Sequence, residues 1–387
     1  MGEWKEYKLG DIADITSSKR IFYSEYVSEG IPFYRSKEII DLYNKRNIST
    51  ELYISESKYC EIQSMYGVPQ ENDILLTSVG SLGFPYLVKA TDKFYFKDGN
   101  LAWIRNINRN IVFPPYLIIW LCSKIGRQKL DEITIGSTQQ ALTISGLKTI
   151  EIALPPLSEQ KRIASILGSL DDKIDLLHRE NETLEAMAET LFRKWFIEDA
   201  KDNFEEKPLS SIAKFLNGIA CQKYPPKNNL EKLPVLKIRE LTNGINSDSD
   251  WATTDVSPEY IVHSGDIIFS WSASLMVKIW NGVDCILNQH LFKVTSDNYP
   301  KWFLYLWCKY HLNEFISIAE SHATTMGHIK RSDLDTAFVL IPEQNDLCYM
   351  SNIMGPIVNR FDNNNKEIFS LVKMRDSLLH KLISSNH

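Results

Sequence analysis

The feature that most constrains the fold of this chain is a long internal repeat. Six blocks of the first half return in the same order in the second half of the 387 residues. A repeat of this kind fixes the architecture, because each copy must fold into the same sort of unit. The paired blocks are 7–15 with 207–215, 31–39 with 233–241, 71–83 with 264–276, 115–121 with 300–306, 136–155 with 323–342, and 158–167 with 342–351.

Each copy of the repeat has two parts of different character. The first part contains β-branched and aromatic runs such as "DILLTSV", "LAWIRNI" and "KTIEIAL", which are bounded by Gly, Pro and Asn and predict strands around one or two helices. We therefore predict an α+β fold of two tandem repeats, each a mixed α/β globular domain followed by a long helix. The expected globular domains are 1–157 and 206–341, and the expected helical regions are 158–205 and 342–387.

The helical regions carry an apolar heptad pattern. Between residues 158 and 197 there is no proline, and Gly168 is the only glycine. Apolar residues recur at heptad a and d positions, a pattern typical of coiled coils, whereas a single solvated helix would leave an apolar stripe in water. These positions are Ile163, Ile166, Leu170, Ile174, Leu177, Leu184, Ala188, Leu191 and Trp195 in the first helix, and Leu347, Met350, Met354, Ile357, Phe361, Ile368 and Leu371 in the second.

A polar residue on the heptad seam predicts how the two helices align. Asn181 lies on the seam of the first helix, and Asn364 or Asn365 occupies the matching place in the second. Such a residue costs stability but fixes register and orientation. We expect an antiparallel coiled coil, about 60 Å long for a helix of about 40 residues. This pairing would place the globular domains at opposite ends, related by a pseudo-two-fold axis.

The stretch "NIVFPPYLIIW" at 110–120 contains Pro-Pro-Tyr, which is similar to the catalytic loop of adenine-N6 methyltransferases. That loop needs a hydrogen-bond acceptor before the prolines to hold the amine of a flipped base, and here the position is Phe113. The nearby "SVGSLGF" at 78–84 lacks the glycine pattern of a cofactor-binding turn. Because proline suits the first turn of a helix, we predict instead a helix that begins at Pro114 and Pro115.

Composition excludes several classes of protein. No apolar run reaches the length of a membrane span, and the N-terminus has no signal-peptide core, so we expect a cytoplasmic protein without a membrane role. The six cysteines include no Cys-x-x-Cys pair, and we predict neither a disulfide framework nor a metal site. Cys308 and His311 have ligand-like spacing, but "LYLWCKYHL" is more typical of a packed helix.

The net charge of -6 is concentrated in one segment. Residues 158–205 hold 7 Lys and Arg against 12 Asp and Glu, whereas 1–157 hold 18 of each kind and 206–341 hold 13 against 14. Both predicted globular domains are therefore close to neutral. Near-neutral charge leaves room for a local basic face on each domain, so it is compatible with DNA binding without requiring it.

A pseudo-two-fold protein with two unlike reading domains matches a divided DNA site with unlike halves. The candidate contacts are polar and basic residues in repeated loops, because Arg and Lys suit guanine edges or phosphates, Gln suits adenine, and Ser or Thr suits either. In the first domain they are Lys19, Arg20, Arg35, Lys37, Ser78, Ser81, Thr138, Gln139 and Gln140. In the second domain they are Lys223, Lys237, Arg239, Ser272, Gln289, His290, Thr324, Thr325, His328 and Lys330. Arg35 and Arg239 could equally form surface ion pairs.

The segment 154–196, which begins "LPPLSEQKRIASIL", resembles the central repeat region of the specificity subunits of type I restriction-modification enzymes. The resemblance covers essentially the whole chain, and "PPLSEQKRIA" is its most diagnostic part. The distal copy "LIPEQNDLCYMSNIM" departs from it, because the second proline and the Lys-Arg pair are missing.

The resemblance implies a non-catalytic protein in which two target recognition domains on an antiparallel coiled coil read the halves of a bipartite DNA site. It further implies that two modification subunits bind the chain, that restriction subunits complete the enzyme, and that S-adenosylmethionine binds to the modification subunit, so this chain itself needs no cofactor. The helix length would set the unread spacer. Candidate partner contacts on the first helix are Gln160, Arg162, Leu191, Phe192, Trp195 and Phe196. We regard Trp195 and Phe196 as the best of these, because exposed aromatic residues at a helix end are costly without a partner.

Two other functions are open on the sequence alone. An adenine methyltransferase that uses "FPPY" would bind the methyl donor as an isolated chain. A coiled-coil scaffold without a DNA role would be indifferent to base sequence. A specificity subunit instead predicts that exchanging residues 1–157 changes one half of the recognised site.

Overall fold

The computed structural model describes residues 3–46, 48–136, 140–228, 230–246, 248–321 and 328–384. The chain divides into two compact units: unit one comprises Met1–Asp172 with Lys373–His387, and unit two comprises Lys173–Val372. Helix α7 (Leu157–Arg193) begins in unit one and ends in unit two, whereas α13 (Gln344–Ser384) begins in unit two and ends in unit one. Each unit therefore combines one globular part with a segment of both long helices.

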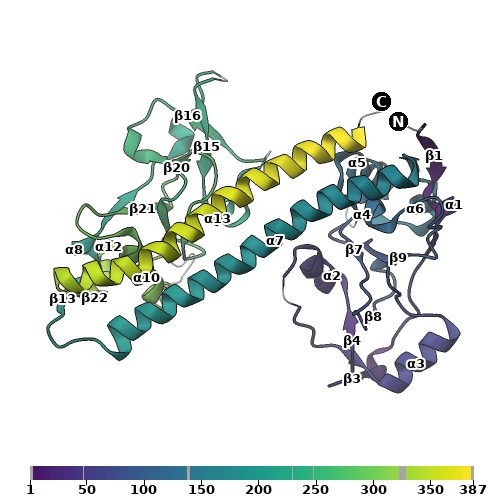
Figure 1. Cartoon of the computed structure of the whole chain (residues 1–387), viewed down its shortest axis with the longest axis horizontal. Helices are drawn as coiled ribbons and strands as arrows, with labels where there is room; N and C mark the ends of the chain where they lie inside the picture. Colours follow the sequence, from purple (N-terminus) through teal and green to yellow (C-terminus); the bar gives the residue numbers. More distant parts are fainter. Residues whose placement is uncertain are drawn as a thin grey trace. The chain divides into compact units, whose positions relative to one another are not determined.

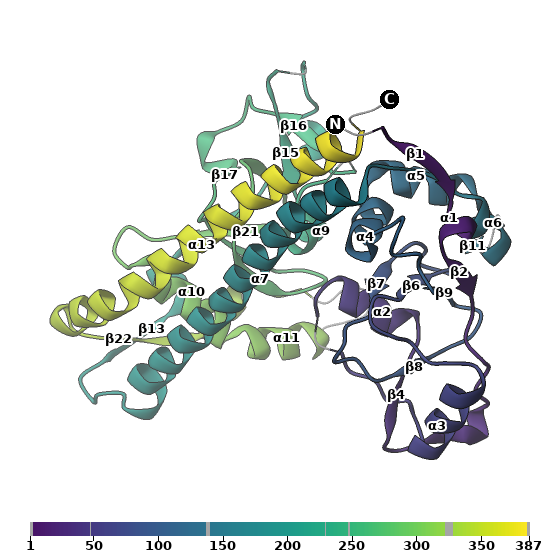
Figure 2. The ribbon, with the colours of Figure 1, turned by 45° about the vertical axis from the view of Figure 1, so that its right-hand side comes forward.

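Unit one contains two four-stranded sheets. The first has the order β2-β9-β6-β7 with antiparallel neighbours (Figure 2). The second has the order β3-β5-β4-β8, in which β4 and β8 are parallel, and β1 with β12 and β10 with β11 form two-stranded ribbons. The strands are β1 (Lys5–Lys8), β2 (Asp14–Thr16), β3 (Tyr26–Val27), β4 (Ile31–Tyr34), β5 (Tyr53–Ile54), β6 (Ile74–Thr77), β7 (Pro85–Leu87), β8 (Tyr95–Phe96), β9 (Leu101–Arg105), β10 (Thr134–Ile135), β11 (Ala141–Leu142) and β12 (Glu151–Leu154). Beside α7 and α13, the helices are α1 (Leu9–Ile12), α2 (Ser36–Tyr43), α3 (Glu56–Met65), α4 (Pro114–Cys122), α5 (Lys124–Glu132) and α6 (Ile144–Thr149).

Strand β6 is buried on both faces, which explains its continuous apolar run. Ile74 and Leu76 belong to the core that includes α4 and the start of α7. Leu75 alternates with them and belongs to a second core with Trp103 of β9 and Ile39 of α2. The side-chain period of two in a strand thus joins two cores across one sheet.

The Pro-Pro-Tyr stretch forms the start of α4, as predicted. Pro114 and Pro115 occupy its first turn, where the missing N–H groups cost nothing. Tyr116 is fully buried, so its ring cannot stack on a flipped base. The N–H of Phe113 donates to Oε1 of Gln160 on α7 at 2.8 Å. The stretch is therefore a structural junction between α4 and α7.

Unit two repeats this architecture. Its sheets have the orders β14-β21-β18-β19 and β16-β15-β20-β17, and β13 pairs with β22. The strands are β13 (Glu205–Pro208), β14 (Lys214–Asn217), β15 (Lys232–Leu236), β16 (Trp251–Thr253), β17 (Ile261–Val262), β18 (Ile267–Ser270), β19 (Met276–Ile279), β20 (Cys285–Leu287), β21 (Leu291–Thr295) and β22 (Phe338–Ile341). The helices are α8 (Leu209–Ile212), α9 (Ile238–Asn243), α10 (Lys301–Tyr310), α11 (Leu312–Ser321) and α12 (Arg331–Thr336).

The predicted repeat is confirmed by backbone contacts that recur at matching positions. The N–H of Leu9 donates to the carbonyl of Ile150 at 2.8 Å in unit one, and Leu209 donates to Ala337 at 2.8 Å in unit two. Further pairs recur in the same way, such as the strand partners Lys5 with Leu154 and Glu205 with Ile341. The two globular parts therefore share one backbone plan.

The long helices pair antiparallel, as the heptad pattern predicts, and lie side by side within each unit (Figure 1). In unit two the Asn181 amide donates to Asn365 at 2.8 Å and accepts from Asn364 at 3.0 Å, which confirms the predicted polar layer. Arg360 also bonds Glu180 at 2.8 Å. In unit one the segments of both helices join the core around α4, and Arg375 of α13 bonds Asp171 of α7 at 3.1 Å.

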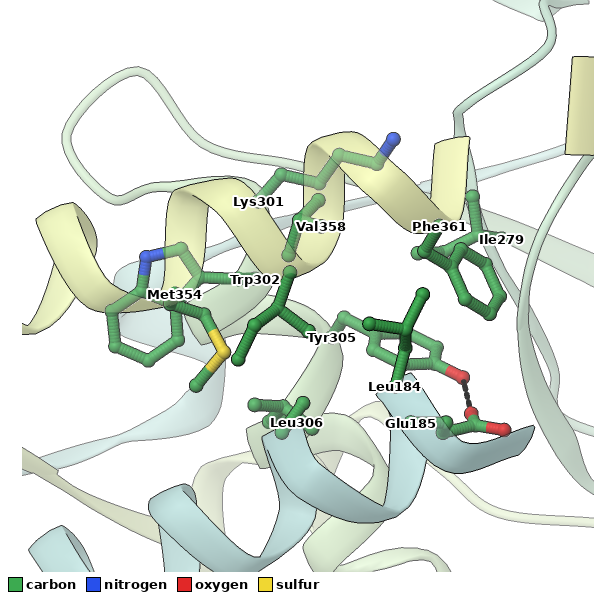
Figure 3. A pocket seen from close by; sticks show the side chains of 12 residues that line it. Leu184, Glu185, Ile279, Lys301, Trp302, Tyr305, Leu306, Met354, Val358 and Phe361 are labelled. Carbon is green, nitrogen blue, oxygen red and sulfur yellow. Dashed lines mark hydrogen bonds between the residues drawn. The ribbon is translucent and has the colours of Figure 1, made fainter. Parts of the chain in front are cut away.

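In unit two, α10 is fastened to α7 beside a small apolar pocket lined by residues of α7, α10, α13 and β19 (Figure 3). The hydroxyl of Tyr305 donates to Glu185, and the ammonium of Lys309 lies 2.8 Å from the same carboxylate. Burial raises the pKa of Glu185, but hydrogen bonds from Lys309 and Tyr305 outweigh it and hold the pKa below its usual value. The carboxylate is therefore a charged anchor between two helices.

Cys308 and His311 lie at the end of α10, as predicted for a packed helix. Cys308 is fully buried, and the imidazole of His311 is hydrogen-bonded to Glu314 and to the carbonyl of Phe338 at 2.9 Å. Within the described ranges, no cluster of three or more His, Cys, Asp or Glu is placed to hold a metal ion. Nor does any helix in those ranges combine the length and apolarity needed to cross a membrane.

Candidate nucleic-acid interface

One edge of the central sheet gathers loops from distant parts of unit one. Because β2, β9 and β6 are antiparallel neighbours, the loops that follow β2 and β6 lie at the same edge as the loop that precedes β9. Hydrogen bonds tie these loops together. The N–H of Ser78 donates to the carbonyl of Asn100 at 2.9 Å, and the N–H of Gly99 donates to Oγ of Ser17 at 3.2 Å. The N–H of Leu142 completes the edge by donating to the carbonyl of Ser78 at 2.8 Å.

Most of the predicted contacts in unit one lie on or beside this edge. Lys19 follows β2, and its ammonium lies 5.0 Å from the ring centre of Tyr66. Arg20 is largely exposed and pairs with Asp98 at 3.1 Å. Lys37, Ser81 and Gln140 are exposed, whereas Ser78 is only 5% exposed, so its contribution is to the loop backbone.

Unit two has the same edge, and it also gathers predicted residues. Oγ of Ser272 lies 3.2 Å from Nδ1 of His290, and the amide of Gln289 lies 3.3 Å from Nε2 of the same ring. Ser272 also forms a strand bridge with His328. Lys223, at the end of a short 3-10 helix, and Lys330, directly before α12, are exposed in the same unit. Thr138, Gln139, Thr324 and Thr325 lie outside the described residues.

In each unit, a buried glutamate forms an ion pair with the arginine that was predicted to contact DNA. Glu38 and Glu240 occupy matching positions of the repeat, and both side chains are fully buried. Arg35 pairs with Glu38 at 2.9 Å, whereas Arg239 pairs with Glu240 at 2.7 Å. Since each guanidinium neutralises a buried carboxylate, both arginines have a structural role. For these two arginines the sequence predicts ion pairs as the alternative to DNA contacts, but with partners that lie on the surface.

The ion pairs determine the protonation state of the carboxyl groups at this edge. Burial raises the pKa of Glu38, but hydrogen bonds from the Arg35 side chain and backbone prevail, and the pKa lies below its usual value. Lys237 forms an ion pair with Asp250, and its hydrogen bond lowers the pKa of that carboxyl. Both acids are thus held in their charged form.

Two residues of the candidate interface were missed by the sequence analysis. The backbone carbonyl of Asn100 accepts hydrogen bonds from the N–H of Ser78 and from Oγ of Ser36, the first residue of α2. In unit two, Trp271 follows β18 and its indole N–H donates to Oδ1 of Asn217 at 3.3 Å. A comparison of the repeat copies could have found Trp271, because it stands where the first copy has Ser78.

The predicted partner contacts on α7 and on the π-helical turn that follows it (Lys194–Glu198) need correction in three places. Gln160 is fully buried and bonds the backbone at Phe113 and, through its amide, the carbonyl of Ile111 at 2.9 Å. Phe192 and Phe196 are also buried, in the core of unit two, because aromatic residues of α10 cover them. These three side chains offer no surface to another protein. The remaining candidates are Arg162, which is exposed and paired with Glu159, and the half-buried Leu191 and Trp195.

Other apolar side chains on the long helices are more exposed than the predicted ones. Leu176 and Met187 of α7 are 52% and 49% exposed, and Tyr349 of α13 is 64% exposed. They lie outside the heptad seam, so the search for a and d positions passed over them. Large exposed apolar groups of this kind are typical of contact surfaces when they cluster.

Comparisons with known proteins agree with this architecture. Residues 1–186 and 201–371 match the model of the type I restriction modification DNA specificity domain. The chain is 28% identical to the MjaIX specificity subunit of Methanocaldococcus jannaschii, over 98% of this chain and 93% of that protein. It is 26% identical to the HindI specificity subunit of Haemophilus influenzae over 51% of this chain and 42% of that protein.

The fold is also similar to a solved structure, the specificity subunit from M. genitalium. The TM-score is 0.61 at 16% identity, and the alignment covers 98% of this chain and 96% of the other. The two mixed sheet groups and the packed helices α7 and α13 are thus the fold of specificity subunits.

Two specificity domains joined by paired long helices define a class of DNA-recognition protein. This chain belongs to the type I restriction-modification DNA specificity family. It is a specificity subunit, the non-catalytic component that recognises the DNA target. Specificity subunits bind no cofactor themselves. The methyltransferase and scaffold alternatives are therefore wrong. Family membership also implies assembly with modification and restriction subunits.

Proposed function

We propose that each unit reads one half of a divided double-stranded DNA site, and that the two half-sites have unlike sequences. One observation carries the proposal: the same sheet edge with its loops occurs twice in the chain. The backbone contacts of the two edges match, whereas their side chains differ. Equal backbones would present side chains to DNA in equivalent ways. Unlike side chains would then select different bases.

Within each unit, the basic residues would contact phosphates and the polar residues would contact bases. Lys19, Arg20 and Lys37 in unit one are exposed cations that suit phosphate contacts, as are Lys223 and Lys330 in unit two. Ser81 and Gln140 in the first unit, and Ser272, Gln289, His290 and His328 in the second, carry the hydrogen-bonding groups that suit base edges. Arg35, Arg239 and Lys237 each form an ion pair with a carboxylate, so they would position the loops of the edge instead of supplying unpaired charge.

The helical regions would bind two modification subunits, one for each repeat. The exposed apolar residues Leu176, Met187 and Tyr349 support this, together with Arg162, Leu191 and Trp195. S-adenosylmethionine would bind the modification subunit, and restriction subunits would complete the enzyme. The complex would act on DNA in the cytoplasm.

The proposal is tested by expressing the chain with its modification subunit and mapping methylated adenines across the host DNA by single-molecule sequencing. We expect one divided motif with two unlike halves and a fixed unread spacer. Exchanging residues 1–157 for those of another specificity subunit should change one half of the motif and leave the other unchanged. A short undivided motif, or a motif indifferent to the exchange, would contradict the two-domain reading.

A further inference from the structure

Three positions of the sheet edge that gathers the candidate DNA contacts are equivalent in the two units. Val79 bridges Ala141 in unit one, and Ser272 bridges His328 in unit two. The residue before each bridge accepts the next hydrogen bond: Ser78 from Leu142 at 2.8 Å, and Trp271 from Ile329 at 3.1 Å. These contacts make Ser78 equivalent to Trp271, and Ala141 equivalent to His328.

The strand register supplies the third position. Thr77 pairs with Leu101 in unit one, and Ser270 pairs with Leu291 in unit two. Asn100 and His290 directly precede these strands and are therefore equivalent. Unit one thus places Ser78, Asn100 and Ala141 where unit two places Trp271, His290 and His328.

In unit two the three rings form one platform, hereafter the Trp271 platform. The indole stacks on Phe292 with ring centres 5.7 Å apart and planes 28° apart. His290 and His328 flank it, with ring centres at 5.9 and 6.4 Å. The indole N–H is held by Asn217, so the ring is buttressed from behind and from one edge. Trp271 nevertheless remains partly exposed.

The fixed position of the indole limits what it can contact. A side chain that wedges between base pairs must project from the surface, whereas this ring is stacked on the sheet and held by a hydrogen bond. A flat apolar surface bordered by imidazole nitrogens suits a different target, an apolar group at a base edge with hydrogen-bonding groups beside it. In the major groove of DNA the apolar group is the methyl of thymine.

We propose that Trp271 is a specificity-determining residue of unit two that contacts a thymine methyl group in its half-site. This inference rests on the proposed function, because it assumes that unit two reads DNA through this edge. Unit one has no aromatic group at the equivalent positions and would read its half-site without such a contact.

The test uses the complex of the full chain with its modification subunit, and duplexes in which each thymine of the site is replaced in turn by deoxyuridine. Loss of one methyl contact should weaken wild-type binding about fourfold at one position in the half-site of unit two. W271A should bind the duplex with thymine and the duplex with deoxyuridine at that position equally well. W271F should retain part of the discrimination, and S78A, the matched change in unit one, should retain all of it.

The outcomes separate the inference from the function it rests on. If wild-type protein binds a divided site but no thymine of that half-site is sensitive to the replacement, the inference is wrong and the proposed function stands. The same holds if W271A discriminates as well as wild type. If the wild-type complex recognises no divided site, the proposed function fails. Should W271A not assemble, the deoxyuridine scan on wild type and W271F still decides the matter.

Discussion

At the residue scale, each unit has a buried glutamate at the equivalent position, but the arginine that pairs with it comes from a different position of the repeat. The repeat aligns Arg35 with Lys237 and Lys37 with Arg239, but the arginine is in each case the residue that pairs with the buried glutamate. A guanidinium is suited to this task because its planar fork matches a carboxylate. The second basic residue is thereby left for another role: Lys37 is exposed, and Lys237 pairs with Asp250.

This difference predicts opposite phenotypes for two neighbouring cations. R35A should destabilise unit one by about 2 kcal/mol, because it leaves the buried Glu38 without its side-chain partner. K37A should change the free energy of unfolding by less than about 0.5 kcal/mol. It should instead weaken DNA binding and lower the slope of affinity against salt by about one phosphate contact. Thermal melting and salt-dependent binding by the assembled complex measure both effects. Equal melting temperatures for R35A and K37A would show that the ion pair contributes little.

The same carboxylate predicts a dependence of stability on pH. The pKa of Glu38 is lower in the folded chain than its usual value near 4.5, because hydrogen bonds from Arg35 outweigh the effect of burial. A lowered pKa contributes stability above the unfolded pKa, and that stability is lost as pH falls through the folded pKa. E38Q should therefore be less stable than wild type at pH 7, and the gap should narrow below pH of about 4.5. Melting curves over this range measure the gap, and a gap independent of pH would exclude the ionised carboxylate as its cause.

At the element scale, the paired helices combine an apolar seam with one polar layer. Asn364 is 1% exposed, and its Oδ1 has no hydrogen-bond partner among the described residues. A layer with an unsatisfied buried atom costs stability, and its benefit is that it fixes register. The layer thus serves alignment of the helices at the expense of their stability.

Single and double substitutions distinguish these two effects. N181L should destabilise unit two by about 1 to 2 kcal/mol, because it removes the partner of a buried amide. N181L combined with N364L should recover most of that loss, since the two buried amides are then replaced by apolar groups and only the half-buried Asn365 remains polar. Denaturant unfolding of the full chain measures both variants. A double variant that is less stable than the single one would show that the amides stabilise the helix pair.

Two adjacent leucines of α7 test the partner surface. Leu176 is 52% exposed, whereas Leu177 is fully buried. L177A should destabilise unit two by about 3 kcal/mol through the cavity that it creates. L176E should leave the melting temperature unchanged but reduce copurification of the modification subunit. If L176E assembles as wild type does, this face of α7 is not the partner surface.

Heptads, repeat blocks and proline positions were enough to predict α4, α7, α13 and the Asn181 layer, because each depends on local pattern. The predicted partner residues were less accurate. Gln160, Phe192 and Phe196 looked like surface residues of a single helix, and only the folded chain reveals that α4 and α10 cover them. The arrangement of the candidate interface could not be predicted from local pattern, because loops that meet at one sheet edge are far apart in sequence.

At the scale of the whole molecule, each unit is completed by the end of a helix that starts in the other unit. The end of α7 supplies Phe192 to the core of unit two, and the π-helical turn that follows it (Lys194–Glu198) supplies Phe196. The end of α13 supplies Ile383 to the core of unit one, where Leu378, Leu379 and Leu382 pack against it. The core of the first domain in the sequence therefore includes residues from the last turns of the last helix.

This dependence predicts a long-range effect of a change near the C-terminus. Ile383 is 5% exposed, so I383A should destabilise unit one by about 3 kcal/mol. Hydrogen exchange should rise in β1, β12 and α4, which lie more than two hundred residues earlier in the sequence, while β18 and α10 of unit two keep their protection. H380A changes an exposed residue of the same helix and should leave both patterns unchanged. Uniform loss of protection in both units would mean that the chain unfolds as a single cooperative body, whereas loss confined to unit two would contradict the assignment of this helix end to unit one.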